Sequence, residues 1–172
     1  MPKALALTAA LVLAASAAFA AGAAAPTDLA GTAVATFQQT CLATRGQGLD
    51  AAVTAILAQP GAKEAASLPA YGSGKPMRTF VDDRQFEYLV RPGKGGRYGC
   101  FVAVGATADE AGGELTEAIR AQLDRLPGLT AKPNKQKQIT YCEWSIAGSK
   151  DDIRVTPKSS LDSILINLEV MQ

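Results

Sequence analysis

The sequence of 172 residues contains no histidine, which removes several common catalytic and metal-binding arrangements at once. Without an imidazole there is no Ser-His-Asp triad, no Cys-His pair and no ordinary general base at neutral pH. Most zinc sites also use histidine. No Ser-x-x-Lys or Cys-x-x-Cys motif occurs in the chain either. We therefore expect a non-catalytic protein with no cofactor and no metal site.

An excess of charge is also lacking, because 17 basic residues stand against 16 acidic ones. Proteins that bind nucleic acid or another bulk polyanion normally carry a clear basic excess. Only 6% of the residues are aromatic, so few rings are present on which bases could stack. We expect no nucleic acid among the partners.

The first 20 residues have the pattern of a secretory signal peptide. Met1-Pro2-Lys3 supplies a positive start, an uncharged run covers 4–15, and Ala18-Phe19-Ala20 matches a small-x-small cleavage site. The apolar run is about a dozen residues long, whereas a spanning helix needs roughly 20. Cleavage is therefore expected near Ala20-Ala21, and an uncleaved anchor that extends to Ala25 is the alternative.

Export follows from this leader. We expect a periplasmic or secreted protein without a stable membrane span after cleavage. A flexible N-terminal segment is expected over residues 21–27, and a single globular α+β domain over residues 28–172.

Apolar residues at helical spacing predict two helices at the start of this domain. The first begins at Thr27 or Asp28 and stops near Gly46, and the second covers residues 49–59, before Pro60-Gly61. Residues 63–68 are predicted to add one helical turn. The inward positions are Ala30, Val34, Phe37 and Cys41 in the first helix, and Leu49, Val53, Ile56 and Leu57 in the second.

The apolar period then changes from 3.6 to 2, which predicts strands at 78–81, 85–91 and 98–104. A long helix is predicted over 109–126, followed by a polar connector over 132–138. Three more strands are predicted near 139–147, 153–156 and 163–170. The fold class is therefore α+β, with two N-terminal helices, three antiparallel strands, one long helix and three antiparallel strands.

Three cysteines, Cys41, Cys100 and Cys142, are an odd number for an oxidising compartment. One disulfide and one free thiol is the simplest arrangement. A bridge between Cys41 and Cys100 would tie the buried face of the first helix to a core strand. We favour this pair and keep Cys142 as a free, core-facing thiol beside Trp144, while the other two pairings stay open.

Basic residues flank a glycine-rich loop at residues 92–99, which lacks the spacing of a nucleotide-binding motif. If this loop meets the connector after the long helix, six cations would form an anion-binding or partner-binding surface. These are Arg91, Lys94, Arg97, Lys132, Lys135 and Lys137. The simpler interpretation is a set of solvated loops that keep the sheet edges soluble.

Two pairs of adjacent carboxylates, Asp82-Asp83 and Asp151-Asp152, lie at or near expected turns. Adjacent side chains usually point apart and aspartate favours turns, so we interpret both pairs as turn formers. The alternative function is a small histidine-free envelope hydrolase. Such an enzyme would require two carboxylates that converge in a cleft, with the pKa of one of them raised.

Four features occur together: the signal peptide, Phe37-x-x-x-Cys41-Leu42 on the first helix, Cys100-Phe101-Val102 on a core strand, and a late strand with Trp144. In these features the chain resembles small exported bacterial proteins of unassigned function. The resemblance supports the Cys41–Cys100 bridge and implies no catalytic residue, while Cys142 departs from the pattern. We therefore expect an exported protein that binds an envelope component or a partner protein through its basic loops.

Overall fold

The computed structural model describes residues 26–65, 67, 75–105, 109–132, 142–156 and 163–171. For residues 26–27 and 109–112 it describes the backbone alone. The predicted signal peptide and its cleavage site lie outside the described residues, as do residues 21–25 of the segment expected to be flexible. Its last two residues, Pro26 and Thr27, are helical.

The N-terminal helical region consists of α1 (Pro26–Phe37), the π-helical turn η1 (Gln38–Leu42) and α2 (Leu49–Leu57). In η1 the amide of Ala43 donates to the carbonyl of Gln38 at 2.8 Å, the wider hydrogen bond of a π-helix. The four inward positions predicted for the first helix are all buried. In the described chain, no helix is long and apolar enough to cross a membrane.

One inward position predicted for the second helix is wrong, because Leu57 is 46% exposed. The buried residues of α2 are Ala52, Val53 and Ile56. Ala52 therefore belongs to the buried stripe and Leu57 does not. Leu57 follows Ile56 directly, and successive side chains of an α-helix point about 100° apart.

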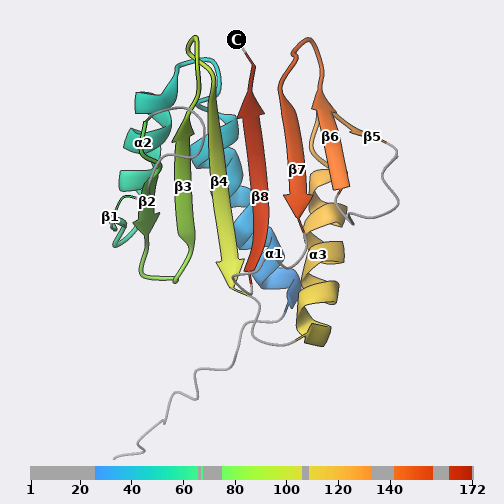
Figure 1. Ribbon diagram of the computed structural model, residues 1–172. Coiled ribbons are helices and arrows are strands. Elements are labelled where there is room, and N and C mark those ends of the chain that lie inside the picture. Colours follow the sequence, from blue (N-terminus) through green and yellow to red (C-terminus); the bar gives the residue numbers. More distant parts are fainter. Residues whose placement is uncertain are drawn as a thin grey trace, which may run out of the picture.

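The described strands form one eight-stranded antiparallel sheet in the order β1-β2-β3-β4-β8-β7-β6-β5 (Figure 1). Its last strand in sequence, β8, lies in the middle of the sheet and pairs with both β4 and β7. The strands are β1 (Lys63–Glu64), β2 (Arg78–Val81), β3 (Glu87–Pro92), β4 (Tyr98–Gly105), β5 (Leu129–Lys132), β6 (Cys142–Ile146), β7 (Asp152–Thr156) and β8 (Ser163–Val170).

The α+β class is confirmed, and two of these strands were not predicted. Residues 63–64 form the edge strand β1 instead of a helical turn, and the bidentate pair of Arg78 with Glu64 joins β1 to β2. At the other edge Leu129–Lys132 forms β5, so Lys132 belongs to a strand and not to a polar connector. The long helix α3 (Asp109–Leu123) ends three residues earlier than predicted.

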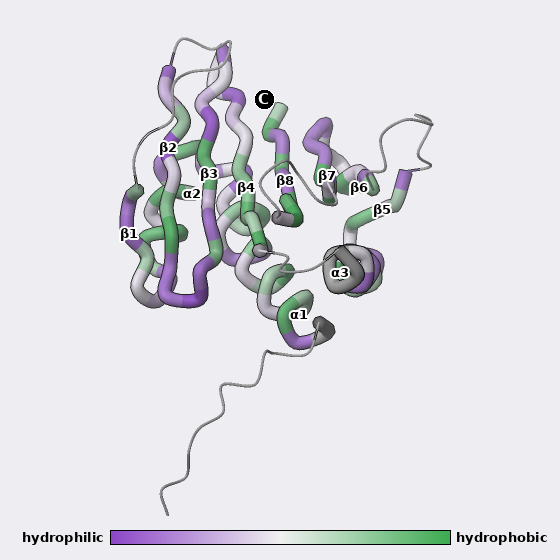
Figure 2. Tube along the Cα trace, turned by 60° about the horizontal axis from the view of Figure 1, so that its bottom comes forward, coloured by the Kyte–Doolittle hydropathy of each residue, from purple (hydrophilic) through white to green (hydrophobic). Residues whose placement is uncertain are grey.

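The helices cover one face of the sheet (Figures 1 and 2). The row of paired residues Phe80, Tyr88, Val102 and Ile166 faces them and is buried. The neighbouring row, Thr79, Leu89, Phe101 and Asn167, points to the opposite side, which we call the open face because no described helix covers it. The core therefore lies between the sheet and the helices.

A disulfide between Cys41 of η1 and Cys100 of β4 joins the helical layer to the sheet, with both residues fully buried. This is the pair that we favoured from the sequence. Cys142 of β6 is the free cysteine, and it is partly buried against the core.

Candidate functional site

The candidate site lies at the β3–β4 hairpin, whose loop covers residues 93–97. The amide of Gly93 donates to the carbonyl of Arg97 at 2.8 Å, and a Cβ at Gly93 would come within 2.9 Å of that oxygen. Gly95 and Gly96 have φ angles of 63° and 80°, which favour glycine. These glycines close a tight loop and so hold Lys94 and Arg97 at the end of the sheet. The expected hairpin is therefore present.

An ion pair crosses the sheet beside this loop. Arg91 on β3 and Glu169 on β8 both pair with Gly99 of the intervening strand β4. Since Gly99 has no side chain, the guanidinium of Arg91 reaches over it to the carboxylate of Glu169. The Phe101 ring occupies the same space, because a Cβ on Gly99 would lie only 2.8 Å from its Cε2. Gly99 therefore allows the contact between two charged residues on non-adjacent strands.

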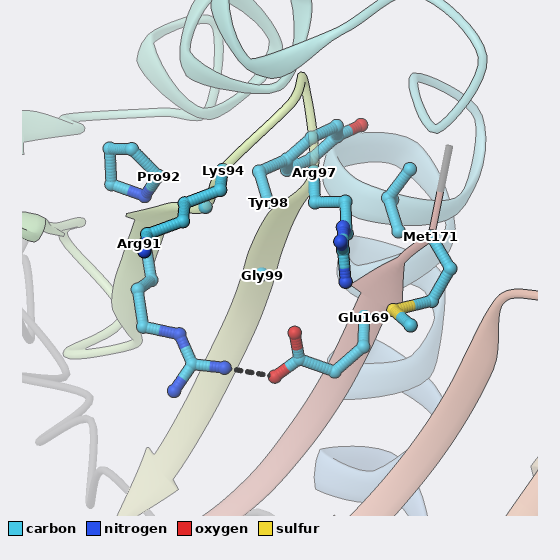
Figure 3. A pocket seen from close by; sticks show the side chains of 10 residues that line it. Arg91, Pro92, Lys94, Arg97, Tyr98, Gly99, Glu169 and Met171 are labelled. Atoms are coloured by element: carbon cyan, nitrogen blue, oxygen red, sulfur yellow. Dashed lines mark hydrogen bonds and ion pairs between the residues drawn. The ribbon is translucent and has the colours of Figure 1, made fainter. Parts of the chain in front are cut away.

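These residues surround a shallow hollow of about 330 Å³, which we call the basic pocket (Figure 3). Figure 3 shows Arg91, Lys94 and Arg97 around it, with Glu169 joined to Arg91. Three cations against one carboxylate leave an excess of two positive charges. Lys94 and Arg97 are exposed, and in the described part of the chain their side chains have neither an ion pair nor a hydrogen bond.

The chemistry of the basic pocket suits an anion. The ammonium of Lys94 acts as a compact point charge, and the guanidinium of Arg97 can donate two parallel hydrogen bonds to a carboxylate or phosphate. Arg91 is held in place by Glu169 and by the Phe101 ring, whose centroid lies 5.5 Å from its guanidinium carbon. Binding of an anion therefore requires ordering of only two flexible side chains.

Lys132 does not join the predicted surface of six cations. Lys132 lies on β5, five strand spacings from β3, or about 24 Å away. Its ammonium is paired with Asp152 and Glu143, and these hydrogen bonds raise its pKa. Lys135 and Lys137 lie outside the described residues. Of the four described members of the predicted surface, the structure brings together Arg91, Lys94 and Arg97.

The first carboxylate pair is divided between two environments. Asp82 is buried and accepts hydrogen bonds from the backbone of Arg84 and Phe86, the guanidinium of Arg84 and the hydroxyl of Tyr88. Burial opposes its ionisation, but the hydrogen bonds outweigh this and lower its pKa. Asp83 is exposed. Asp82 therefore holds the β2–β3 turn together, as a turn former does.

The second carboxylate pair is also occupied by structural contacts. Asp151 accepts a hydrogen bond of 2.8 Å from the amide of Met171 and lies 3.8 Å from Arg45. Asp152 is paired with Lys132. These contacts give no support to the paired-carboxylate chemistry considered from the sequence. Among the described residues, no group of three or more Cys, Asp or Glu side chains could hold a metal ion.

Cys142 and Trp144 contribute to the packing of β6. Burial raises the pKa of the Cys142 thiol, which lowers its thiolate fraction. Trp144 is buried and its indole donates a hydrogen bond of 2.8 Å to Asp124. Trp144 is therefore a core residue and not a stacking platform for a ligand.

A second hollow, of about 380 Å³, lies on the open face and shares Arg91 with the basic pocket. We call it the apolar groove, and its apolar lining includes Met77, Val81, Leu89, Phe101, Ala103 and Leu165. This groove and the roles of Gly99 and Glu169 were not predicted from the sequence. A signal for it was present, since β3, β4 and β8 carry apolar residues on both faces, which is typical of strands covered on both sides.

Comparison of the chain with models of protein families, with curated proteins and with solved structures finds no match.

Proposed function

We propose that this chain is an exported, non-catalytic binding protein whose β3–β4 hairpin holds the anionic group of an envelope component. The observation that carries the proposal is the exposure of two cations, Lys94 and Arg97, side by side. Both are exposed at one pocket without an acidic partner among the described residues. Arg125 and Lys150 are also exposed without an ion pair among the described residues, but they line neither pocket and do not meet a second such cation there.

Two further features support export to an oxidising compartment. The first 20 residues have the charge and apolar pattern of a cleaved leader. The buried Cys41–Cys100 disulfide fits the same compartment, because such bonds persist outside the cytoplasm. In that compartment, the anionic partners that a protein encounters include components of the cell envelope.

The exposed charges predict a salt-dependent interaction. Attraction between exposed ions is screened over about 8 Å at physiological ionic strength. We therefore expect envelope association to weaken as the salt concentration rises.

Charge reversal at the loop tests this function. In cells that produce the protein, Lys94→Glu with Arg97→Glu should move it from the envelope fraction to the soluble fraction. The matched control is Arg125→Glu with Lys150→Glu, which changes the same charge at exposed positions outside the basic pocket. This control should fractionate like the wild type. Unchanged fractionation of the loop variant would overturn the proposal.

A further inference from the structure

We infer that the anionic component is a lipid, with its charged head group at Lys94 and Arg97 and an acyl chain in the apolar groove. The inference rests on the proposed function and adds the chemical class of the ligand. It is carried by two hollows of different chemistry, one cationic and one apolar, that share Arg91 in their lining.

The groove is built on the open face of the sheet. Leu89, Phe101 and Leu165 come from three adjacent strands, β3, β4 and β8, and all three are only partly buried. The alternation of each strand directs these side chains away from the helices. The groove therefore offers apolar side chains at a surface where polar residues are the norm.

Arg91 is the point where the groove and the basic pocket meet. It lines both hollows, and its guanidinium lies over the Phe101 ring of the groove while it binds Glu169 of the pocket. Gly99, which lines the pocket, leaves room for the same ring. A ligand with a charged head and an apolar tail would thus find both surfaces side by side.

The distribution of charge along the groove orients such a ligand. Arg91 lies at one end and Glu87 lines the groove four residues earlier on the same strand, about 14 Å away. The excess positive charge of the basic pocket lies at Lys94 and Arg97, beyond this end, because Arg91 itself is paired with Glu169. An anionic head group is therefore attracted to this end and repelled from the glutamate end. This polarity fits a single head group at Lys94 and Arg97, with the tail directed past Arg91 towards Glu87.

A peptide segment fits this face less well. The backbone groups of β3, β4 and β8 are engaged by a strand on each side, and β1 pairs with Phe80 and Val81 of β2. Over these strands the groove presents side chains and not a free sheet edge. A peptide laid across it would lose water from its own amides without gaining hydrogen bonds. An acyl chain has no such requirement.

Titration with soluble amphiphiles separates the head from the tail. Lysophosphatidylglycerol, used below its critical micelle concentration, should bind the protein in isothermal titration calorimetry. Lysophosphatidylcholine with the same chain and glycerol phosphate without a chain should each bind at least 10-fold more weakly. Equal affinity for the two lysolipids, or equal affinity for glycerol phosphate, would overturn the inference.

Variants then assign each part of the ligand to its hollow. Lys94→Gln with Arg97→Gln, and separately Leu89→Thr and Leu165→Thr, should each weaken lysophosphatidylglycerol binding several-fold. The controls are Arg125→Gln with Lys150→Gln, and Leu57→Thr at an exposed leucine on α2. Thermal unfolding checks that each variant is folded, and the two groove variants are independent in case one is not.

The pattern of losses distinguishes this inference from the proposed function. Loss in the loop variant with wild-type affinity in both groove variants would overturn the acyl-chain site and leave anion binding intact. Wild-type affinity in the loop variant would contradict both. If Leu89→Thr changes the oligomeric state in sedimentation without lipid, a second copy of the chain occupies the groove and the inference is overturned.

Discussion

Tyr88 donates a hydrogen bond of 2.7 Å to Oδ2 of Asp82, six residues earlier in the same hairpin. Arg84 lies between them and contacts both, and it also reaches Thr36 of α1 and Gln59 after α2. One buried carboxylate thus connects the β2–β3 turn with both N-terminal helices. The network lies away from both pockets, which assigns it to stability.

Replacement of this carboxylate should destabilise the fold. Asp82→Asn keeps one oxygen, which can accept from the backbone amides of Arg84 and Phe86. It loses the charge and the second oxygen, which accepts hydrogen bonds from the side chains of Tyr88 and Arg84. We expect a loss of about 3 kcal/mol in the free energy of unfolding, since hydrogen bonds to charged groups are each worth about 1.5–3 kcal/mol. Urea unfolding at pH 7 measures it, with Asp83→Asn as the exposed control. Equal losses in the two variants would contradict the role of Asp82.

The same network predicts a component of the acid denaturation. The pKa of Asp82 is lowered in the folded protein, so the folded state binds its proton less readily than the unfolded state does. The stabilisation is therefore present above the unfolded pKa of about 3.9 and is lost as the pH falls through the folded value. Urea unfolding of Asp82→Asn across this range should show a weaker pH dependence than the wild type. Parallel curves for the two proteins would rule this out.

Removal of the disulfide should have a large effect on stability. The bridge joins residues 59 positions apart, for which the chain-entropy model gives about 4 kcal/mol. We expect a loss of this order in Cys41→Ala with Cys100→Ala, measured by urea unfolding. Cys142→Ala is the control and should lose less, because Cys142 is unbridged and only partly buried. Equal stability of the oxidised and reduced wild-type protein would contradict this prediction.

Gly99 should be sensitive to the addition of a single methyl group. A Cβ there would lie 2.8 Å from the Phe101 ring and would force it away from Arg91. We expect Gly99→Ala to lose about 1–3 kcal/mol, the usual cost of overpacking. At Gly105 on the same strand, no atom of the described residues lies within 4 Å of the position that a Cβ would take, so Gly105→Ala should unfold like the wild type. Similar stabilities for the two variants would show that the space above Gly99 is not needed.

Local patterns were sufficient for much of this fold. The spacing of Ala30, Val34, Phe37 and Cys41 placed one helical face correctly, although η1 replaces the last α-helical turn. Alternation likewise predicted strands at 85–91 and 98–104, where β3 and β4 are found. The helical and strand periodicities both arise from one buried face of a single element. They can therefore be recognised in a short window of one sequence.

Features that depend on strand pairing were missed. Residues 63–64 follow closely after a helix in the sequence, but they pair with β2 and so form a strand. Lys132 was grouped with Arg91 by charge, whereas the strand order puts β5 at the far edge. Glu169 lies 78 residues from Arg91, and only the β4–β8 register brings it to the basic pocket. No local window contains such information.

Neutralisation of Glu169 should strengthen the proposed site. Glu169→Gln raises the excess positive charge of the basic pocket from two to three and releases Arg91 from its ion pair. We expect several-fold tighter binding of lysophosphatidylglycerol with a steeper salt dependence, as an added cation predicts. Stability should change by less than about 1 kcal/mol, because the pair is partly exposed. Glu117→Gln removes one carboxylate from the exposed side of α3 and controls for net charge. Equal gains in affinity for the two variants would mean that overall charge, and not the basic pocket, attracts the ligand.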